Sequence, residues 1–122
     1  MDQSKSLDLN VYEICVDSAL IQSKELIETY LFECQCTLFL VDITKEDSFN
    51  LIKDLLANIN TSKFPYLKMF LVLNKLDLES TRAVQVADVN EFLQSHSNLG
   101  TQEISLRSGD NLKELLRKMI LF

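Results

Sequence analysis

The chain has 122 residues, of which 47% are hydrophobic and 25% are charged, and its formal net charge at pH 7 is −6. This length and composition indicate a single globular domain over residues 1–122. The negative charge argues against nucleic acid or an anionic membrane surface as the main partner, because both repel an acidic protein.

The sequence shows no sign of a membrane anchor or of export. No apolar run approaches the roughly 20 residues that a transmembrane helix needs. Residues 118–122 contain no cysteine that could carry a prenyl group. Cys15, Cys34 and Cys36 form no even disulfide framework, which favours a reducing compartment. We therefore expect a cytoplasmic protein without a direct membrane anchor.

Four apolar stretches predict β-strands. In the first, Leu7, Leu9 and Val11 alternate with polar residues, which is typical of a half-buried strand. The second and third are continuous apolar runs, of the kind found in strands that are buried on both faces. The four strands are expected near residues 7–16, 37–43, 68–73 and 102–106.

Helices are expected in the intervals between these strands. Apolar residues recur there at spacings of three and four, which predicts amphipathic helices. The helices are expected over about 18–32, 46–60, 86–95 and 112–119. Residues 98–100 should end the third helix, and residues 78–86 should form a loop. The alternation of strands and helices predicts an α/β fold with a parallel sheet flanked by helices.

Polar residues follow directly after the third predicted strand, in the run Asn74-Lys75-Leu76-Asp77. In open α/β sheets, ligands bind just beyond the carboxyl ends of the strands. An Asn-Lys-x-Asp run at such a strand end resembles the guanine-reading motif of the Ras-like small GTPases. The resemblance implies that Asp77 accepts hydrogen bonds from N1 and N2 of guanine, that Asn74 fixes the loop, and that the Lys75 stem lies under the ring.

Two further stretches are similar to the same family, in the same order and spacing. Residues 103–107, Glu-Ile-Ser-Leu-Arg, resemble the family's Glu-Thr-Ser-Ala-Lys. The resemblance implies that Ser105 braces the loop and that Leu106 and Arg107 stand beside the base, where the leucine would crowd it. Residues 41–49 resemble a Val-Tyr-Asp-x-Thr…Glu-Ser-Phe stretch of Rab and Ras proteins, which supports the fold alone.

A fourth similarity concerns residues 16–21, Val-Asp-Ser-Ala-Leu-Ile, which lie where the family has Trp-Asp-Thr-Ala-Gly-Gln. In this alignment Asp17 matches the carboxylate that holds Mg²⁺ through water, so it would be a vestigial metal position. Leu20 replaces the glycine whose amide meets the γ-phosphate. Ile21 replaces the glutamine that orients the attacking water, a role that isoleucine cannot perform. In another register Asp17 would have no special position.

Glycine is scarce, and this bears on phosphate binding. The chain contains only Gly100 and Gly109. A loop that cradles phosphates needs glycine where its backbone turns with positive φ and approaches the phosphates closely. Residues 1–99 contain none, so the domain is expected to lack the phosphate-loop segment. The resemblance runs from about Leu7 to Met119 and matches the C-terminal two-thirds of the family.

Three hypotheses about function follow. The first is a catalytically inactive pseudo-GTPase that acts as a protein-interaction or regulatory module in intracellular signalling or trafficking. The second is a fragment or short isoform of a working Ras/Rab-like GTP-binding protein that hydrolyses GTP. The third is an unrelated α/β binding protein with a chance Asn-Lys-x-Asp run.

The first hypothesis fits the substitutions at Leu20 and Ile21 best. It implies no catalytic residue, no required cofactor, no Mg²⁺ and at most weak binding of GTP or GDP. Loss of the first strand and helix of such a fold would uncover apolar surface and a strand edge. We therefore expect a protein partner, or self-association, through the sheet face beside residues 7–16.

Overall fold

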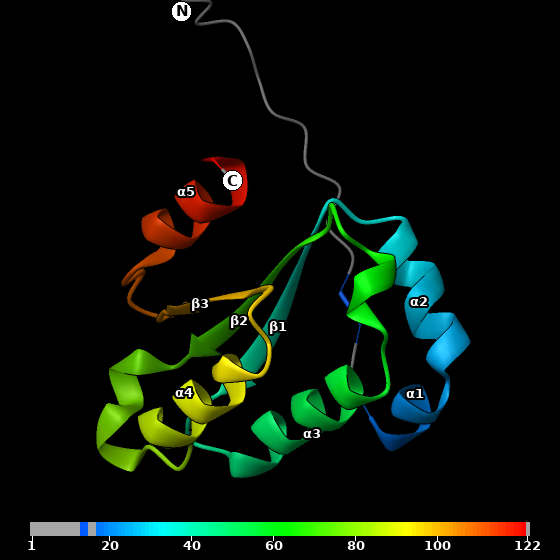
Figure 1. Ribbon diagram of the computed structural model, residues 1–122. Coiled ribbons are helices and arrows are strands. Elements are labelled where there is room, and N and C mark those ends of the chain that lie inside the picture. Colours follow the sequence, from blue (N-terminus) through cyan, green and yellow to red (C-terminus); the bar gives the residue numbers. More distant parts are fainter. Residues whose placement is uncertain (1–12, 15–16, 122) are drawn as a thin grey trace, which may run out of the picture.

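The computed structural model describes residues 13–14 and 17–121. Three parallel strands form one sheet in the order β1-β2-β3, with helices on both of its faces (Figure 1). The strands are β1 (Cys36–Asp42), β2 (Lys68–Asn74) and β3 (Leu99–Glu103). The predicted α/β class with a parallel sheet is confirmed.

Helices connect and cover the strands. They are α1 (Ser18–Gln22), α2 (Lys24–Phe32), α3 (Glu46–Ala57), α4 (Val86–Gln94) and α5 (Leu112–Leu121), with 3-10 helices over Thr61–Lys63 and Leu76–Thr81. In Figure 1 the helices α1 to α4 lie on one side of the sheet and α5 lies on the other. Among the described residues, no helix has the length and apolar character needed to span a bilayer.

Strand β2 is the centre of the core, because its residues Met69 to Leu73 are all at most 4% exposed. Side chains alternate along a strand, so neighbouring residues face opposite sides of the sheet. Leu71 packs into the larger apolar cluster with α1 to α4, while Phe70 and Val72 pack with Leu115 of α5 in the smaller one. Burial on both faces explains why β2 reads as a continuous apolar run.

The helix predicted over 18–32 is broken at Ser23, so α1 and α2 are separate helices. The backbone of Ser23 has ψ 61°, which is not helical, and its amide donates to Leu20 O at 2.9 Å. Its hydroxyl donates to Ala19 O at 3.0 Å. A serine that bonds to the preceding turn in this way competes with helix continuation. The expected loop over 78–86 also differs, since it begins within the 3-10 helix Leu76–Thr81.

Strand β3 begins three residues before the position predicted for it. Gly100 was expected to end a helix, but it lies inside the strand opposite Phe70 of β2. A Cβ atom at this glycine would lie 2.6 Å from Cδ1 of Phe70. A glycine within a strand often marks such a close approach. The prediction that Gly100 ends a helix was therefore wrong.

The strand predicted over 7–16 lies largely outside the described residues. Its described part, Glu13 and Ile14, belongs to no strand, and Ile14 is 41% exposed. The sheet of the described residues therefore has three of the four expected strands.

A Gly100→Ala variant tests the close approach to Phe70. The added methyl group has no room against the ring, so we expect a loss of about 1–3 kcal/mol in the free energy of unfolding, as for other overpacked cores. Urea denaturation measures this loss. Thr101→Ala, at the exposed next position of β3, serves as the control and should change stability much less. Equal stability of both variants would contradict the proposed lack of space.

Candidate functional site

The ends of β2 and β3 are held side by side by backbone hydrogen bonds. Ile104 N donates to Leu73 O at 2.8 Å, and Leu76 N donates to Ile104 O at 3.0 Å. The loops that follow the two strands therefore start next to each other. We call the residues of these two loops, Asn74 to Asp77 and Ser105 to Arg107, the strand-end corner.

Two hydrogen bonds tie the two loops of the strand-end corner together, and a third fixes Ser105. The Ser105 hydroxyl donates to Asp77 Oδ1 at 2.7 Å, and it accepts from Ser108 N at 3.1 Å. Leu106 N donates to Asn74 Oδ1 at 3.1 Å. Ser105 is fully buried at 0% exposure, so its hydroxyl needs these partners. The structure thus brings together Asn74, Asp77, Ser105 and Leu106.

The side chains of Arg107 and Leu106 take no part in this hydrogen-bond network. Leu106 is 56% exposed, and Arg107 is also exposed. Within the described part of the chain, Arg107 makes no side-chain hydrogen bond or ion pair in the corner. No contact in the described part of the structure therefore supports the prediction that Arg107 lies beside a base.

Lys75 links the corner to the end of β1. Its backbone is left-handed, with φ 74° and ψ 37°, which is uncommon for a residue other than glycine. Its Nζ lies 2.9 Å from Asp42 Oδ2. Asp42 Oδ1 accepts from Thr44 N at 2.9 Å and from the Thr44 hydroxyl at 2.6 Å. The sequence analysis assigned the stretch that contains Asp42 a role in the fold only. Asp42 lies opposite Asn74 in the parallel sheet, and this pairing of two strand ends could have indicated its role.

These contacts lower the pKa of Asp42. Burial alone would raise it, but the hydrogen bonds from Thr44 and Lys75 and the lysine's charge outweigh burial and lower the pKa from 3.8 to about 2. Because the pKa is lower in the folded than in the unfolded chain, ionised Asp42 stabilises the fold above about pH 4. This stabilisation is lost as the pH falls towards 2.

An Asp42→Asn variant tests this ionic network. The change in pKa from 3.8 to about 2 corresponds to about 2 kcal/mol of stability near pH 7. We expect the variant to be less stable by about 1–2 kcal/mol at pH 7, and about half of this difference to be gone by pH 3. Urea denaturation at both pH values measures it. Asp54→Asn, at an exposed position of α3, is the control, and an equal pH dependence for both variants would contradict the assignment.

Asp17, Leu20 and Ile21 have structural roles in α1. Asp17 Oδ1 accepts from Leu20 N at 2.8 Å and so caps the start of the helix. The side chain of Ile21 is 9% exposed and packs into the larger core cluster. Among the described residues, no three Asp, Glu, His or Cys side chains come together in a way that would hold a metal ion.

Among the described residues, the strand-end corner and α1 differ in the polar groups that they leave for a ligand. Asp77 is exposed, and Ser105 holds its carboxylate through Oδ1 alone among the described contacts. A carboxylate held in this way can accept from two neighbouring N–H groups. At α1, by contrast, the Leu20 amide already donates to the Asp17 carboxylate. The Leu20 amide is therefore not free to donate to a phosphate.

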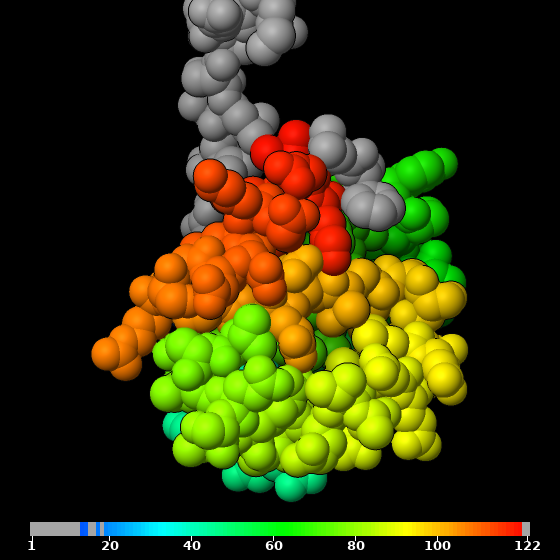
Figure 2. Space-filling view, turned by 90° about the vertical axis from the view of Figure 1, so that its left-hand side faces the viewer, coloured from blue at the N-terminus to red at the C-terminus, as the bar shows by residue number. Residues whose placement is uncertain are grey.

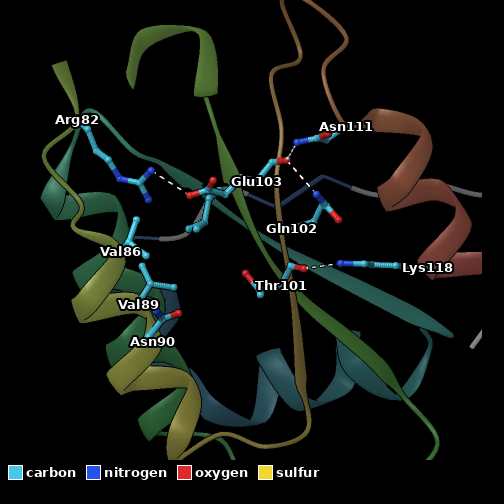
Figure 3. A pocket seen from close by; sticks show the side chains of 10 residues that line it. Arg82, Val86, Val89, Asn90, Thr101, Gln102, Glu103, Asn111 and Lys118 are labelled. Atoms are coloured by element: carbon cyan, nitrogen blue, oxygen red, sulfur yellow. Dashed lines mark hydrogen bonds and ion pairs between the residues drawn. The ribbon is translucent and has the colours of Figure 1, made fainter. Parts of the chain in front are cut away.

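A separate cavity of 310 Å³ lies along the outer side of β3, between α4 and α5 (Figure 3). Arg82 lines it with a side chain that is 8% exposed and pairs with Glu103 Oε1 at 2.9 Å. Lys118 Nζ donates to Thr101 O at 2.9 Å, and Asn111 Nδ2 donates to Glu103 O at 2.9 Å. Figure 2 shows this side of the molecule, where α4 (yellow), β3 (orange) and α5 (red) meet. Lys118 of α5 and Asn111, which precedes α5, thus cap two carbonyls of β3, those of Thr101 and Glu103.

A parallel sheet of this kind, with an Asn-Lys-x-Asp loop braced by a serine at its strand ends, defines a small GTPase-like domain. The chain belongs to the Ras family, whose family model matches residues 19–121.

Three relatives show how much of each protein the sequence similarity covers. The chain is 35% identical over 78 residues to the ras-related protein Rab-5B of Dictyostelium discoideum, covering 64% of this chain and 36% of the relative. It is 31% identical over 83 residues to Rab-3 of Caenorhabditis elegans and 29% identical over 83 residues to human Rab-3A, in both cases covering 68% of this chain and 37% of the relative. The chain therefore spans little more than a third of the length of these relatives.

Proposed function

We propose that this Ras-family chain does not hydrolyse GTP and acts in the cytoplasm as a protein-interaction or regulatory module of intracellular signalling or trafficking. One observation carries the proposal: Ile21 lies in the apolar core, at the position where the family alignment has the glutamine that orients the attacking water. A buried isoleucine offers neither a donor nor an acceptor to water. The hydrogen bond between Leu20 N and Asp17 supports the same conclusion.

Nucleotide binding in this proposal is weak and limited to the base. The strand-end corner offers Asp77 to the base edge, braced by Ser105. Most of the affinity of such domains comes from contacts to the phosphates and Mg²⁺, which the α1 segment of this chain does not supply. The protein therefore requires neither GTP, GDP nor Mg²⁺ for its work.

Phosphate release with GTP and Mg²⁺ under multiple turnover tests the proposal. We expect a rate equal to that of buffer, because phosphoryl transfer depends on electrostatic stabilisation that these residues do not provide. Asp17→Ala should leave this background unchanged. A rate well above buffer that Asp17→Ala abolishes would overturn the proposal.

An apolar surface supports the interaction role. Leu40 of β1 is 49% exposed, and Leu116 and Ile120 of α5 are 48% and 59% exposed. Exposed apolar side chains that cluster on one side of a domain mark contacts with other proteins. We propose a protein partner or self-association on the sheet face beside residues 7–16, with no nucleic acid and no direct membrane anchor.

A second candidate is a fragment or short isoform of a working GTP-binding protein. Two observations favour it: the chain spans only 36–37% of the length of its relatives, and the strand-end corner keeps the braced Asp77. Sequencing the 5′ end of the transcript tests this candidate. An open frame upstream of Met1 that encodes Gly-x-x-x-x-Gly-Lys-Ser would support it. Transcripts that start translation only at Met1 would support the first proposal.

A further inference from the structure

Two adjacent residues of the loop after β3 donate hydrogen bonds to the loop after β2. The Ser105 hydroxyl donates to Asp77 Oδ1 at 2.7 Å, and the next backbone amide, Leu106 N, donates to Asn74 Oδ1 at 3.1 Å. Both loops follow the carboxyl ends of their strands, at the same end of the sheet (Figure 1). Because Leu106 N is bonded to the carbonyl carbon of Ser105, this amide lies next to the hydroxyl that holds Asp77.

The hydrogen-bonding edge of guanine needs both an acceptor and a donor from the protein. It carries two N–H donors, at N1 and N2, and one acceptor, the carbonyl oxygen O6, which lies next to N1. Asp77 supplies the acceptor in the proposed base binding, and Leu106 N is the donor that the fold places beside it. A backbone amide has a single hydrogen to donate. While Leu106 N donates to Asn74, it is not free to donate to O6.

The lysine of the strand-end corner is also engaged in another contact. Lys75 Nζ lies 2.9 Å from Asp42 Oδ2, at the end of β1. The other oxygen of this carboxylate accepts from the amide and the hydroxyl of Thr44, at 2.9 and 2.6 Å. The ion pair therefore directs the lysine head group towards a carboxylate that the end of β1 holds in place.

The side chain of Asn74 can turn without disturbing the sheet. Its backbone carbonyl oxygen accepts from Ile43 N, just after β1, at 3.2 Å, and this bond does not involve the side chain. The hydrogen bond from Leu106 N to Asn74 joins two neutral groups, and a bond from the same amide to O6 would also be neutral. Because one such bond replaces the other, contact with O6 would add little free energy to binding while Asn74 is present.

We propose that Asn74 sets the specificity of the strand-end corner: its side chain occupies the Leu106 amide, so the corner recognises the N1–H and N2–H pair of a guanine base and not its O6. This inference rests on the base binding in the proposed function and names the part of the base that is recognised. The occupied amide also contributes to the weakness of that binding, since one of the hydrogen bonds available to guanine is not gained.

Titration with two nucleotides, followed by NMR, tests this specificity. The probes are GMP and its thio analogue, in which sulfur, a weak acceptor, replaces O6, both below neutral pH, where N1 keeps its proton. We expect the unmodified chain to bind the two equally. Asn74→Ala frees the amide, so it should bind GMP about 2–10-fold more tightly, the value of one neutral hydrogen bond, and prefer GMP to the analogue by a similar factor. Asn50→Ala, at an exposed position of α3, is the matched control and should change neither affinity.

Hydrogen exchange of the Leu106 amide tests the contact with Asn74 in the absence of nucleotide. We expect slow exchange in the unmodified chain and faster exchange in Asn74→Ala, which has no acceptor for this amide. Asn74→Asp keeps an acceptor oxygen at the same position, so exchange should remain slow in this variant. Circular dichroism checks that each variant folds.

Three results would count against the inference. Weaker GMP binding in Asn74→Ala would overturn it, because the Asn74 side chain would then itself contact the base. Equal exchange of the Leu106 amide with and without the Asn74 side chain would also overturn it. Absence of GMP binding in both chains at millimolar concentration would overturn the base binding on which the inference rests. None of these results bears on the proposed lack of hydrolysis, which the phosphate-release assay tests separately.

Discussion

Replacing Ile21 by glutamine, the residue that the family alignment has at this position, is expected to destabilise the chain and to bring no GTP hydrolysis. Ile21 is 9% exposed and packs in the larger core cluster. Its replacement loses apolar burial and places an amide among apolar side chains, where unpaired polar groups cost about 1–3 kcal/mol. With the lost burial, we expect a decrease of about 2–4 kcal/mol in the free energy of unfolding.

Urea denaturation and phosphate release measure the two parts of this prediction. Gln22→Ala, at the exposed next position of α1, is the control and should affect stability only slightly. A second variant, Leu20→Gly with Ile21→Gln, completes the family's Gly-Gln pair and should also fail to hydrolyse GTP. If either variant gained turnover, the chain would be a GTPase inactivated by point substitutions and not a module with another role.

The second large effect concerns Asp77. We expect GDP at millimolar concentration to shift the amide resonances of Asn74 and Leu106, and ADP to shift neither, because only guanine presents two adjacent donors to the carboxylate. Asp77→Asn should weaken GDP binding by about 10–100-fold, since each hydrogen bond to a charged group is worth about 1.5–3 kcal/mol. Titrations followed by NMR measure these changes.

Asparagine is the informative substitution here because it can still accept from the Ser105 hydroxyl. Asp77→Ala would leave this buried hydroxyl, at 0% exposure, without its acceptor at 2.7 Å. We therefore expect Asp77→Ala to destabilise the loop and Asp77→Asn to leave stability nearly unchanged. GDP binding that is tight and unchanged in Asp77→Asn would show that the strand-end corner does not read the base.

The strands that were easiest to predict are those with the strongest burial. β1 and β2 are continuous apolar runs, and the structure has them within one residue of the predicted bounds. β3 begins at Leu99 because Gly100 must lie against the ring of Phe70, a contact between distant residues that local sequence does not show. The break at Ser23 was missed because the apolar spacing continues through it.

The strand-end corner was largely predictable because its residues lie in short motifs at strand ends. Parallel strands bring such ends together, and Asn74, Asp77, Ser105 and Leu106 do meet. The ion pair between Lys75 and Asp42 was missed, since it depends on the left-handed backbone at Lys75. Asp17, which the family alignment places at a metal ligand, caps the start of α1 in the structure.

The short length of α1 has a consequence for how the folded chain opens. A helix of five residues does not persist alone, because helix nucleation is costly. It is held by the Asp17 cap, by burial of Ile21, and by Asn58 Nδ2, which donates to Ile21 O at 3.5 Å. Such weakly anchored elements open by local fluctuations well below the global unfolding energy. Proteases should therefore cut the folded chain first around Ser23, before any cleavage within β2.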